Sequence, residues 1–122
     1  MQYLAMIYGD AGRWEALSDE ERTATYARYT AFAEEAGAAG VLVDGAELKA
    51  TASATTVRVR DGETLVTDGP FVEAKEALGG YFLLERASID DAVDWAARIP
   101  GADHGAIEVR PCYVDESEEA VT

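Results

Sequence analysis

Carboxylates and a lysine gather in residues 68–80, the segment DGPFVEAKEALGG, and these are the residue types with which this sequence could do chemistry. Asp68, Glu73 and Glu76 stand close to Lys75, one of only two lysines in the chain. A carboxylate whose pKa is raised by apolar surroundings can act as a general acid or base, and a lysine can hold a substrate carboxylate or phenolate. The segment therefore predicts a cleft in which these four residues are the candidate catalytic groups.

A purely structural interpretation of the same segment stays open. Asp68 can accept hydrogen bonds from backbone amides just ahead of it, and Gly69 is biased towards extended conformations by the proline that follows. Phe71 is expected to pack inward as an anchor, and residues 73–76 can form one helical turn at most. The paired glycines at positions 79 and 80 let the backbone approach a neighbour closely or bend before the next strand.

Three further residues, Tyr8, His104 and Arg110, lie where a ligand could meet the fold. Tyr8 and Arg110 are expected at the ends of strands, where Arg110 can bind an anion or pair with a surface acid. His104 is either an exposed loop residue or a proton shuttle at a pocket rim. Cys112 has no evident activating base and is expected to be a small buried hydrophobe. The candidate ligand-binding residues are therefore Tyr8, Asp68, Lys75, His104 and Arg110.

The composition argues against several classes of site and partner. One cysteine and one histidine among 122 residues exclude a structural cysteine zinc site and a histidine-rich metal site. No phosphate-binding glycine loop or nucleophile elbow occurs, so we expect neither a metal nor a cofactor. The formal net charge of -14 repels phosphate backbones and anionic lipids, which disfavours nucleic acids and membrane surfaces as partners.

The chain is long enough for one domain with a core of its own. We expect this domain to span residues 1–114 and residues 115–122 to form an acidic, disordered tail. The first residues carry no basic region, and no apolar run approaches the roughly 20 residues of a membrane span. A cytoplasmic protein is therefore the expectation.

Short apolar runs separated by turn residues predict the strands. Asp61-Gly62 between two alternating runs predicts a β-hairpin with a type I′ turn, and we expect this ribbon to be partly solvated. Two other runs, one near the N-terminus and one after the glycine pair, are apolar on both alternating faces. The expected strands are residues 3–8, 41–48, 56–60, 63–67, 81–84 and 106–110.

Two amphipathic segments predict helices. Ser18 and Glu21 form a capping box for the first helix, which is expected to end near Ala36. The second helix follows the cap residue Ser88 and stops at the proline of position 100. Aromatic residues of the first helix are expected to pack in the core, namely Tyr26, Tyr29 and Phe32.

The expected order along the chain is strand, helix, strand, hairpin, strand, helix, strand. Without the hairpin this is the βαββαβ unit of ferredoxin-like α+β folds. Two helices cover only one face of such a sheet, yet residues 3–8 and 81–84 are apolar on both faces. The other face would be a large exposed apolar patch on a monomer, so we predict a homodimer of two copies packed sheet to sheet.

The motif DGPF at residues 68–71, followed by EAKEALGGY at residues 73–81, resembles the signature of the DGPF-domain branch of the YCII-related proteins. The resemblance extends over most of the chain and includes WAARIP at residues 95–100. It implies a ferredoxin-like dimer related to dimeric α/β barrels, and it implies little about activity. The sequence departs from the pattern at Ala74, where many branch members carry threonine. It also has no histidine before His104, which argues against a histidine-dependent mechanism.

Three functions stay open. The first is a small dimeric DGPF/YCII-related protein of unassigned biochemical role, with a cleft for a small organic ligand near the motif. The second is a cofactor-independent lyase or isomerase that uses the motif carboxylates for proton transfer; among the proteins that the sequence resembles is a dehydrochlorinase of chlorinated aromatics. The third is a regulatory module that partners an extracytoplasmic-function sigma factor, as the resemblance implies for some relatives.

Overall fold

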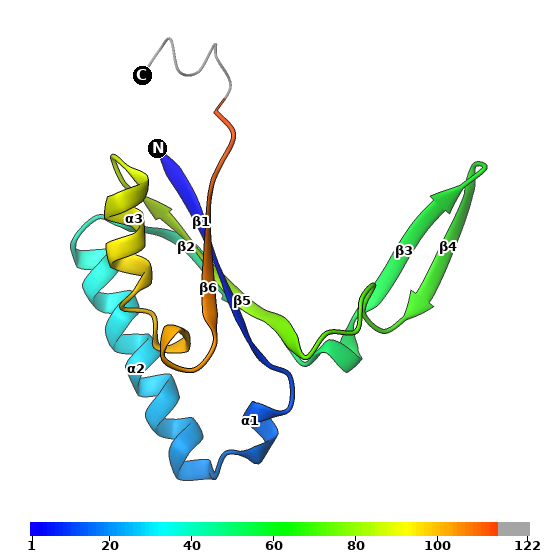
Figure 1. The fold of residues 1–122 in the computed structure, drawn as a ribbon, viewed down its shortest axis with the longest axis horizontal. Coiled ribbons are helices and arrows are strands. Elements are labelled where there is room, and N and C mark those ends of the chain that lie inside the picture. Colours follow the sequence, from blue (N-terminus) through cyan, green and yellow to red (C-terminus); the bar gives the residue numbers. More distant parts are fainter. Residues whose placement is uncertain (115–122) are drawn as a thin grey trace.

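The structure is a computed structural model that describes residues 1–114, so the predicted acidic tail of residues 115–122 lies outside the described residues. The predicted order of strands, long helices and hairpin is confirmed, and one short extra helix precedes the first long one (Figure 1). The strands are β1 (Gln2–Asp10), β2 (Leu42–Glu47), β3 (Thr55–Arg60), β4 (Glu63–Asp68), β5 (Glu76–Glu85) and β6 (Ala106–Pro111). The helices are α1 (Arg13–Ala16), α2 (Asp19–Ala38) and α3 (Ile89–Ala96), and 3₁₀ turns occupy Thr51–Ser53 and Pro100–Asp103.

Four strands form one antiparallel sheet in the order β2-β5-β1-β6, and β3 pairs with β4 in a separate two-stranded ribbon. Both long helices, α2 and α3, lie on one side of the four-stranded sheet (Figure 1). The molecule is therefore an α+β fold in which helices cover one face of an antiparallel sheet. Within residues 1–114, no helix has both the length and the apolar character needed to cross a lipid bilayer.

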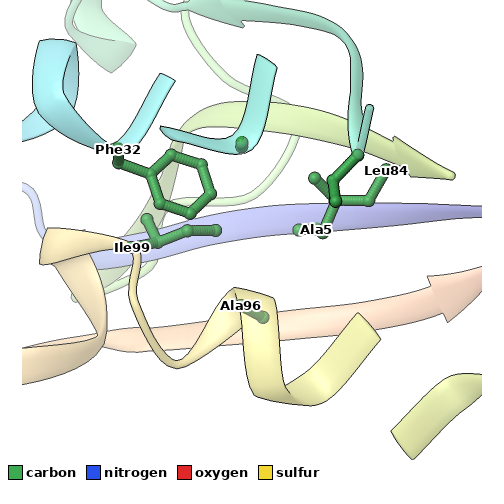
Figure 2. Close-up of a cluster of buried hydrophobic side chains, with 7 residues drawn as sticks. Ala5, Phe32, Leu84, Ala96 and Ile99 are labelled. Atoms are coloured by element: carbon green, nitrogen blue, oxygen red, sulfur yellow. The ribbon is translucent and has the colours of Figure 1, made fainter. Parts of the chain in front are cut away.

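The core lies between the two long helices and the covered face of the sheet (Figure 2). Phe32 of α2 and Ala96 of α3 are buried with Ile99 against Ala5 of β1 and Leu84 of β5. Burying an aliphatic side chain such as Leu84 contributes about 1.5–3 kcal/mol relative to leaving it exposed. This cluster holds the sheet and helices in the positions from which the candidate site is built.

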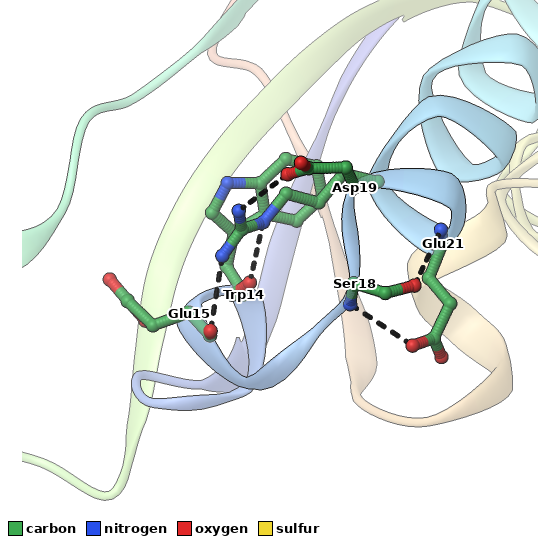
Figure 3. A network of polar contacts seen from close by, with 6 residues as sticks. Trp14, Glu15, Ser18, Asp19 and Glu21 are labelled. Atoms are coloured by element: carbon green, nitrogen blue, oxygen red, sulfur yellow. Dashed lines mark hydrogen bonds and ion pairs between the residues drawn. The ribbon is translucent and has the colours of Figure 1, made fainter.

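The first long helix begins as predicted and runs slightly further than predicted. Ser18 Oγ accepts a hydrogen bond from the Glu21 amide at 3.1 Å, and the Glu21 carboxylate accepts from the Ser18 amide at 3.0 Å (Figure 3). The helix continues through Gly37 and ends at Ala38. The chain then turns at Gly40, whose φ of 73° lies in the left-handed region that glycine adopts without strain.

The aromatic residues of α2 differ in their burial. Phe32 is buried and Tyr29 is half-buried, as expected of a core stripe. Tyr26 is 47% exposed, so the expectation that it packs in the core is wrong. It lies nearer the N-terminal end of α2, where the helix borders a cavity instead of the sheet.

The second face of the four-stranded sheet carries a row of apolar side chains. Leu4 lies opposite Leu83, and Met6 lies opposite Tyr81, on the neighbouring strands β1 and β5. Their strand neighbours Ala5 and Leu84 point into the core, so by alternation these four point away from the helices. Within residues 1–114 both long helices lie on the other side, which leaves this face uncovered in the single chain (Figure 1).

The ribbon of β3 and β4, residues 55–68, is called the hairpin arm below. Asp61 and Gly62 have φ values of 52° and 77°, as a type I′ turn requires, so the predicted turn is confirmed. The arm extends away from the sheet on the side opposite to α2 and α3 (Figure 1). The expectation of a partly solvated ribbon understated its exposure, because every residue of β4 is exposed.

The residues that follow the arm do not form the turn that their sequence predicts. Gly69 has a φ of 99° instead of an extended conformation, and its amide donates to the Ala54 carbonyl at 2.7 Å. Thr56 Oγ1 donates to the Gly69 carbonyl at 2.8 Å, so this turn is tied to the base of the arm. Phe71 is 69% exposed, and the expectation that it packs inward is wrong. Its ring lies 4.8 Å from the Arg58 guanidinium of the arm, where a cation–π contact holds it.

The second half of the motif belongs to a strand. No helical turn forms over residues 73–76, and β5 already begins at Glu76. Gly79 and Gly80 therefore lie inside the strand, and the second alternative for the glycine pair, a bend before the strand, does not occur. The predicted close approach is confirmed, because a Cβ on Gly80 would lie 2.8 Å from the Ala46 carbonyl oxygen of β2.

Candidate functional site

A cavity of about 500 Å³ lies between α1, the N-terminal half of α2 and the ends of β1, β2 and β5. Its wall is largely apolar and rich in aromatic rings, which is the usual character of a site for a small organic molecule. The aromatic residues among its lining are Tyr8 of β1, Trp14 of α1, Tyr26 and Tyr29 of α2, and Tyr81 and Phe82 of β5. By alternation the side chain of Tyr81 points to the other face of the sheet, so Tyr81 borders the cavity through its backbone.

The short helix α1 forms one wall of the cavity, and Arg22 holds it in place (Figure 3). The Arg22 Nε donates to the Trp14 carbonyl at 3.0 Å, and one terminal nitrogen donates to the Glu15 carbonyl at 3.1 Å. The Trp14 carbonyl also accepts from the Leu17 amide at 3.3 Å, so Arg22 adds a second bond to it and also bonds the Glu15 carbonyl at the end of the helix. The Trp14 ring packs edge-on against Tyr26, with 5.2 Å between ring centroids. Arg22 thus positions one aromatic wall from outside the cavity.

Tyr26 and Glu47 form a hydrogen-bonded pair across the cavity from α2 to β2. The Tyr26 hydroxyl donates to Glu47 Oε1 at 2.9 Å, and both residues line the cavity. This hydrogen bond to the carboxylate raises the pKa of Tyr26 above its usual value. The pair therefore offers a ligand a neutral phenol and a carboxylate acceptor side by side, which is an arrangement able to bind or move a proton.

The far end of the cavity is packed tightly around Gly101. A Cβ at this position would lie 2.8 Å from Ile7 Cγ2 and 2.9 Å from the Tyr29 hydroxyl, so only glycine fits there. Burial raises the pKa of Tyr29, whose ring stacks on Phe82 with 6.4 Å between centroids. These residues form a closed, neutral floor beneath the cavity.

Three basic side chains lie at the rim of the cavity: Arg13, Lys49 and His104. Within residues 1–114, neither Arg13 nor Lys49 forms an ion pair, although four other arginines do. Partial burial, reinforced by the nearby Arg13 guanidinium, lowers the pKa of His104. His104 is therefore held towards its neutral form, and the permanent positive charge of the rim comes from Arg13 and Lys49.

The structure brings together only part of the predicted site. Tyr8 and His104 line the cavity as the sequence suggests. Arg110 lies on the uncovered face of the sheet, and its guanidinium donates to the Glu108 carboxylate at 2.9 Å. Of its two predicted roles, Arg110 therefore shows the pairing with a surface acid. The four candidate catalytic residues of the motif do not line the cavity, and all four are exposed: Asp68, Glu73, Lys75 and Glu76. Their participation in any reaction stays a prediction.

The motif contributes backbone to the site. Residues 77–81, which contain its two glycines, line the cavity from β5. The Lys75 carbonyl accepts from the Ala11 amide at 3.1 Å, which ties the end of the motif to the turn before α1. Gly80 lets β5 lie close to β2, because a Cβ there would lie 2.8 Å from the Ala46 carbonyl oxygen.

The sequence reasoning missed the residues that carry most of the site chemistry. Arg13, Trp14, Glu47 and Lys49 occur in no motif and share no spacing, because they come from α1 and from the end of β2. The spacing of three positions between Tyr26 and Tyr29 predicts a core position for Tyr26, which is exposed instead. One sequence signal could have indicated the site, namely three aromatic residues close together on one helix: Tyr26, Tyr29 and Phe32. The four-stranded sheet does not extend far enough along α2 to bury all three. Within the described part of the chain, no three metal-ligating side chains gather into a candidate metal site.

Comparisons with known proteins agree with this architecture. The family model of the YCII-related domain matches residues 1–114. An uncharacterized protein of Rhizobium meliloti (strain 1021) is 39% identical over 113 residues, which cover 91% of each chain. Among solved structures, 5-chloro-2-hydroxyhydroquinone dehydrochlorinase from Burkholderia phenoliruptrix AC1100, in complex with 2,5-dihydroxybenzoquinone, superposes with a TM-score of 0.54. It is 17% identical, with 96% of this chain and 98% of that chain covered, so the likeness shows a shared fold. This chain belongs to the YCII-related protein family.

Proposed function

We propose that the protein is a member of the DGPF branch of this family that binds a small ring-shaped organic anion in the cavity. The observation that carries the proposal is an aromatic cavity of about 500 Å³ whose rim holds Arg13 and Lys49 without an ion-pair partner among residues 1–114. Cavities of roughly 300–1,000 Å³ are typical of sites for small molecules. Aromatic walls favour a ring, and unpaired cations favour a carboxylate or phenolate on it.

Basic side chains are scarce in this chain, so their position matters. A formal net charge of -14 means that carboxylates greatly outnumber the basic groups available to them. Within residues 1–114, six of the ten basic side chains form no ion pair, and two of these six, Arg13 and Lys49, line the cavity. The same lining holds the carboxylates of Asp10, Glu15 and Glu47, and a ligand anion would give the two cations a partner. The family neighbour that was solved with 2,5-dihydroxybenzoquinone holds a compact oxygenated ring of the same general class.

Titration calorimetry with benzoate, and with benzyl alcohol as a neutral ring of similar size, tests the proposal. Lys49→Gln should weaken benzoate binding about tenfold or more, since a hydrogen bond to a charged group is worth roughly 1.5–3 kcal/mol, and should leave benzyl alcohol unaffected. Lys75→Gln is the matched control, because the other lysine of the chain lies outside the cavity lining. Equal benzoate affinities in the two variants would contradict the proposal.

A second candidate function, a cofactor-independent lyase or isomerase, is favoured by the pair formed by Tyr26 and Glu47. In an isomerisation, the Glu47 carboxylate takes a proton from one ligand atom and returns it to another, while the Tyr26 hydroxyl holds the carboxylate in position. The protein then ends the cycle unchanged. The dehydrochlorinase fold neighbour is compatible with this chemistry.

Solvent deuterium incorporation into hydroxylated ring compounds, followed by NMR, measures such proton transfer. Glu47→Gln should lower the exchange rate about 10²–10⁴-fold, which is the usual contribution of a general base. Glu76→Gln removes a carboxylate of the motif that does not line the cavity, and it should exchange at the wild-type rate. A slower exchange in Glu76→Gln than in Glu47→Gln would assign the general-base role to the motif carboxylates.

We also propose that two copies pair through the uncovered sheet face in a ferredoxin-like dimer. The apolar row of Leu4, Met6, Tyr81 and Leu83 supports it, because a contiguous apolar patch on a soluble chain usually marks an interface. Light scattering should give about twice the 13.1 kDa of one chain. A monomer at micromolar concentration contradicts the pairing. The sigma-factor partnership stays a prediction.

A further inference from the structure

The hairpin arm presents an apolar face that nothing within its own chain covers. Val57 pairs with Val66 across the ribbon, and Val59 follows on the same face by alternation. These three side chains are 61%, 62% and 59% exposed, respectively. The opposite face carries Arg58 and Arg60, and Arg58 stacks on Phe71. One face of the arm therefore groups the three valines, and the other carries the two arginines together with Leu65.

The arm has no support from the body of the molecule. β3 and β4 form their main contacts with each other, and Figure 1 shows the ribbon standing clear of the sheet and of both long helices. An isolated two-stranded hairpin is marginally stable in water at best. A well-formed ribbon with a valine face therefore calls for a surface from another molecule.

We propose that the arm lays its valine face on a second copy of this chain, an inference that rests on the proposed pairing. The arm projects from the same side of the sheet as the uncovered apolar face, so in a two-fold pair each copy can receive the arm of the other (Figure 1). The net charge of -14 argues against nucleic acid or an anionic membrane as the occupant. The two arginines of the arm lie on its other face, so the contact with the second copy is assigned to the valines.

The size of a stable interface points the same way. Such an interface buries about 800 Å² on each partner and involves roughly 20–30 residues a side. The row of Leu4, Met6, Tyr81 and Leu83 supplies four of these residues from each copy. The arm adds further apolar surface. In a symmetric pair both copies contribute their arms, so each arm contact occurs twice in the interface.

The arm is also joined to the cavity at both of its ends. Residues 48–51, just before the arm, line the cavity and include Lys49. Residues 77 and 78, which follow the turn that closes the arm, line it as well. Seating the arm on a second copy therefore fixes the wall that carries Lys49, and pairing and anion binding support each other.

The triple substitution Val57→Thr, Val59→Thr and Val66→Thr tests the inference by analytical ultracentrifugation. Threonine keeps the β-branched shape that suits a strand, so the free ribbon should form as before while its face loses apolar character. The dimer dissociation constant should rise at least about 100-fold, because six valines leave the symmetric interface. Val93→Thr on α3, an equally simple change at a 48% exposed valine on the helix side, is the matched control and should pair like the wild type.

The outcomes separate the proposals. If the triple variant pairs like the wild type, the arm does not contact the second copy, although the pairing through the sheet face still stands. If the wild type itself is a monomer, both the pairing and the arm contact fall. In the monomeric triple variant, benzoate affinity should drop severalfold relative to the dimeric wild type. An unchanged affinity there overturns the coupling to Lys49 and leaves the cavity proposal intact.

Discussion

The body of the molecule and the hairpin arm contain the same kind of strand residue and bury it to opposite extents. Leu84 in β5 is 0% exposed, whereas Val66 in β4 is 62% exposed. Both stand in strands with apolar side chains, and both strands form where the sequence predicts strands. The difference is that α2 and α3 cover the sheet, and no helix of residues 1–114 covers the arm (Figure 1).

This contrast shows that strand patterning and burial are separate pieces of information. Alternation specifies which side chains share a face, because successive residues of a strand point to opposite sides. It does not specify whether another element will pack on that face. In the body, α2 and α3 of the same chain pack on the sheet. The arm has no such element packed on it within residues 1–114. Substitutions in the two regions should therefore affect different properties.

The largest expected difference comes from removing one aliphatic side chain in each region. Leu84→Ala should lower the free energy of unfolding by about 2–5 kcal/mol, since it removes a fully buried side chain and leaves a cavity. Val66→Ala should change it by less than about 0.5 kcal/mol at a concentration where the chain is monomeric. Urea unfolding followed by circular dichroism measures both. Similar losses in the two variants would mean that the arm packs on its own body.

A smaller difference in stability is expected when one glycine of each region is replaced by alanine. A Cβ on Gly105 would overlap the Tyr8 carbonyl oxygen of β1, so Gly105→Ala should cost about 1–3 kcal/mol of global stability through forced backbone shifts. Gly62 has a φ of 77° with open space around it, so Gly62→Ala strains the turn of the arm by about 1–2 kcal/mol.

Hydrogen exchange of backbone amides separates these two effects. Gly105→Ala should speed exchange throughout β1, β5 and β6, because the four-stranded sheet unfolds as a unit. Gly62→Ala should speed exchange within residues 55–68 and leave the sheet unchanged. Faster exchange of the sheet in the Gly62 variant would show that the arm and the body fold cooperatively.

The smallest expected effect is the pH dependence contributed by His104 at the cavity rim. Its pKa in the folded protein lies below 6.5, so the unfolded chain binds this proton more readily than the folded chain. The corresponding stability is present above pH 6.5 and is lost as the pH falls through the lowered folded pKa. Thermal unfolding between about pH 8 and pH 5 should therefore show a smaller decline in His104→Gln than in the wild type. Parallel declines would remove His104 from the pH response.

Several features could be predicted from the sequence because their causes are local. The capping box of Ser18 and Glu21 and the type I′ turn at Asp61 form as expected, since each involves residues within a few positions of one another. The placement of Phe71 could not be predicted. An aromatic residue after a turn usually packs inward, but this one follows an arm that leaves the body, and its partner is Arg58.

The candidate site was the least predictable part for the same reason. The motif carboxylates stand together in the sequence and so predict a site, yet the cavity is lined by residues from α1, α2 and the end of β2. Tyr26 and Glu47 are separated by 21 positions and meet only because α2 packs beside β2. Such a meeting depends on the relative positions of a helix and a sheet, which no local pattern encodes.

The amino-acid sequence alone determined the order of the elements, the caps and turn between them, and the apolar character of both sheet faces. These follow from propensity and periodicity, which act over a few neighbouring residues. Tertiary packing decided which of those faces is covered, where the arm extends, and which side chains surround the cavity. Burial depends on what packs against a residue across space, and that partner is supplied by distant segments of the chain.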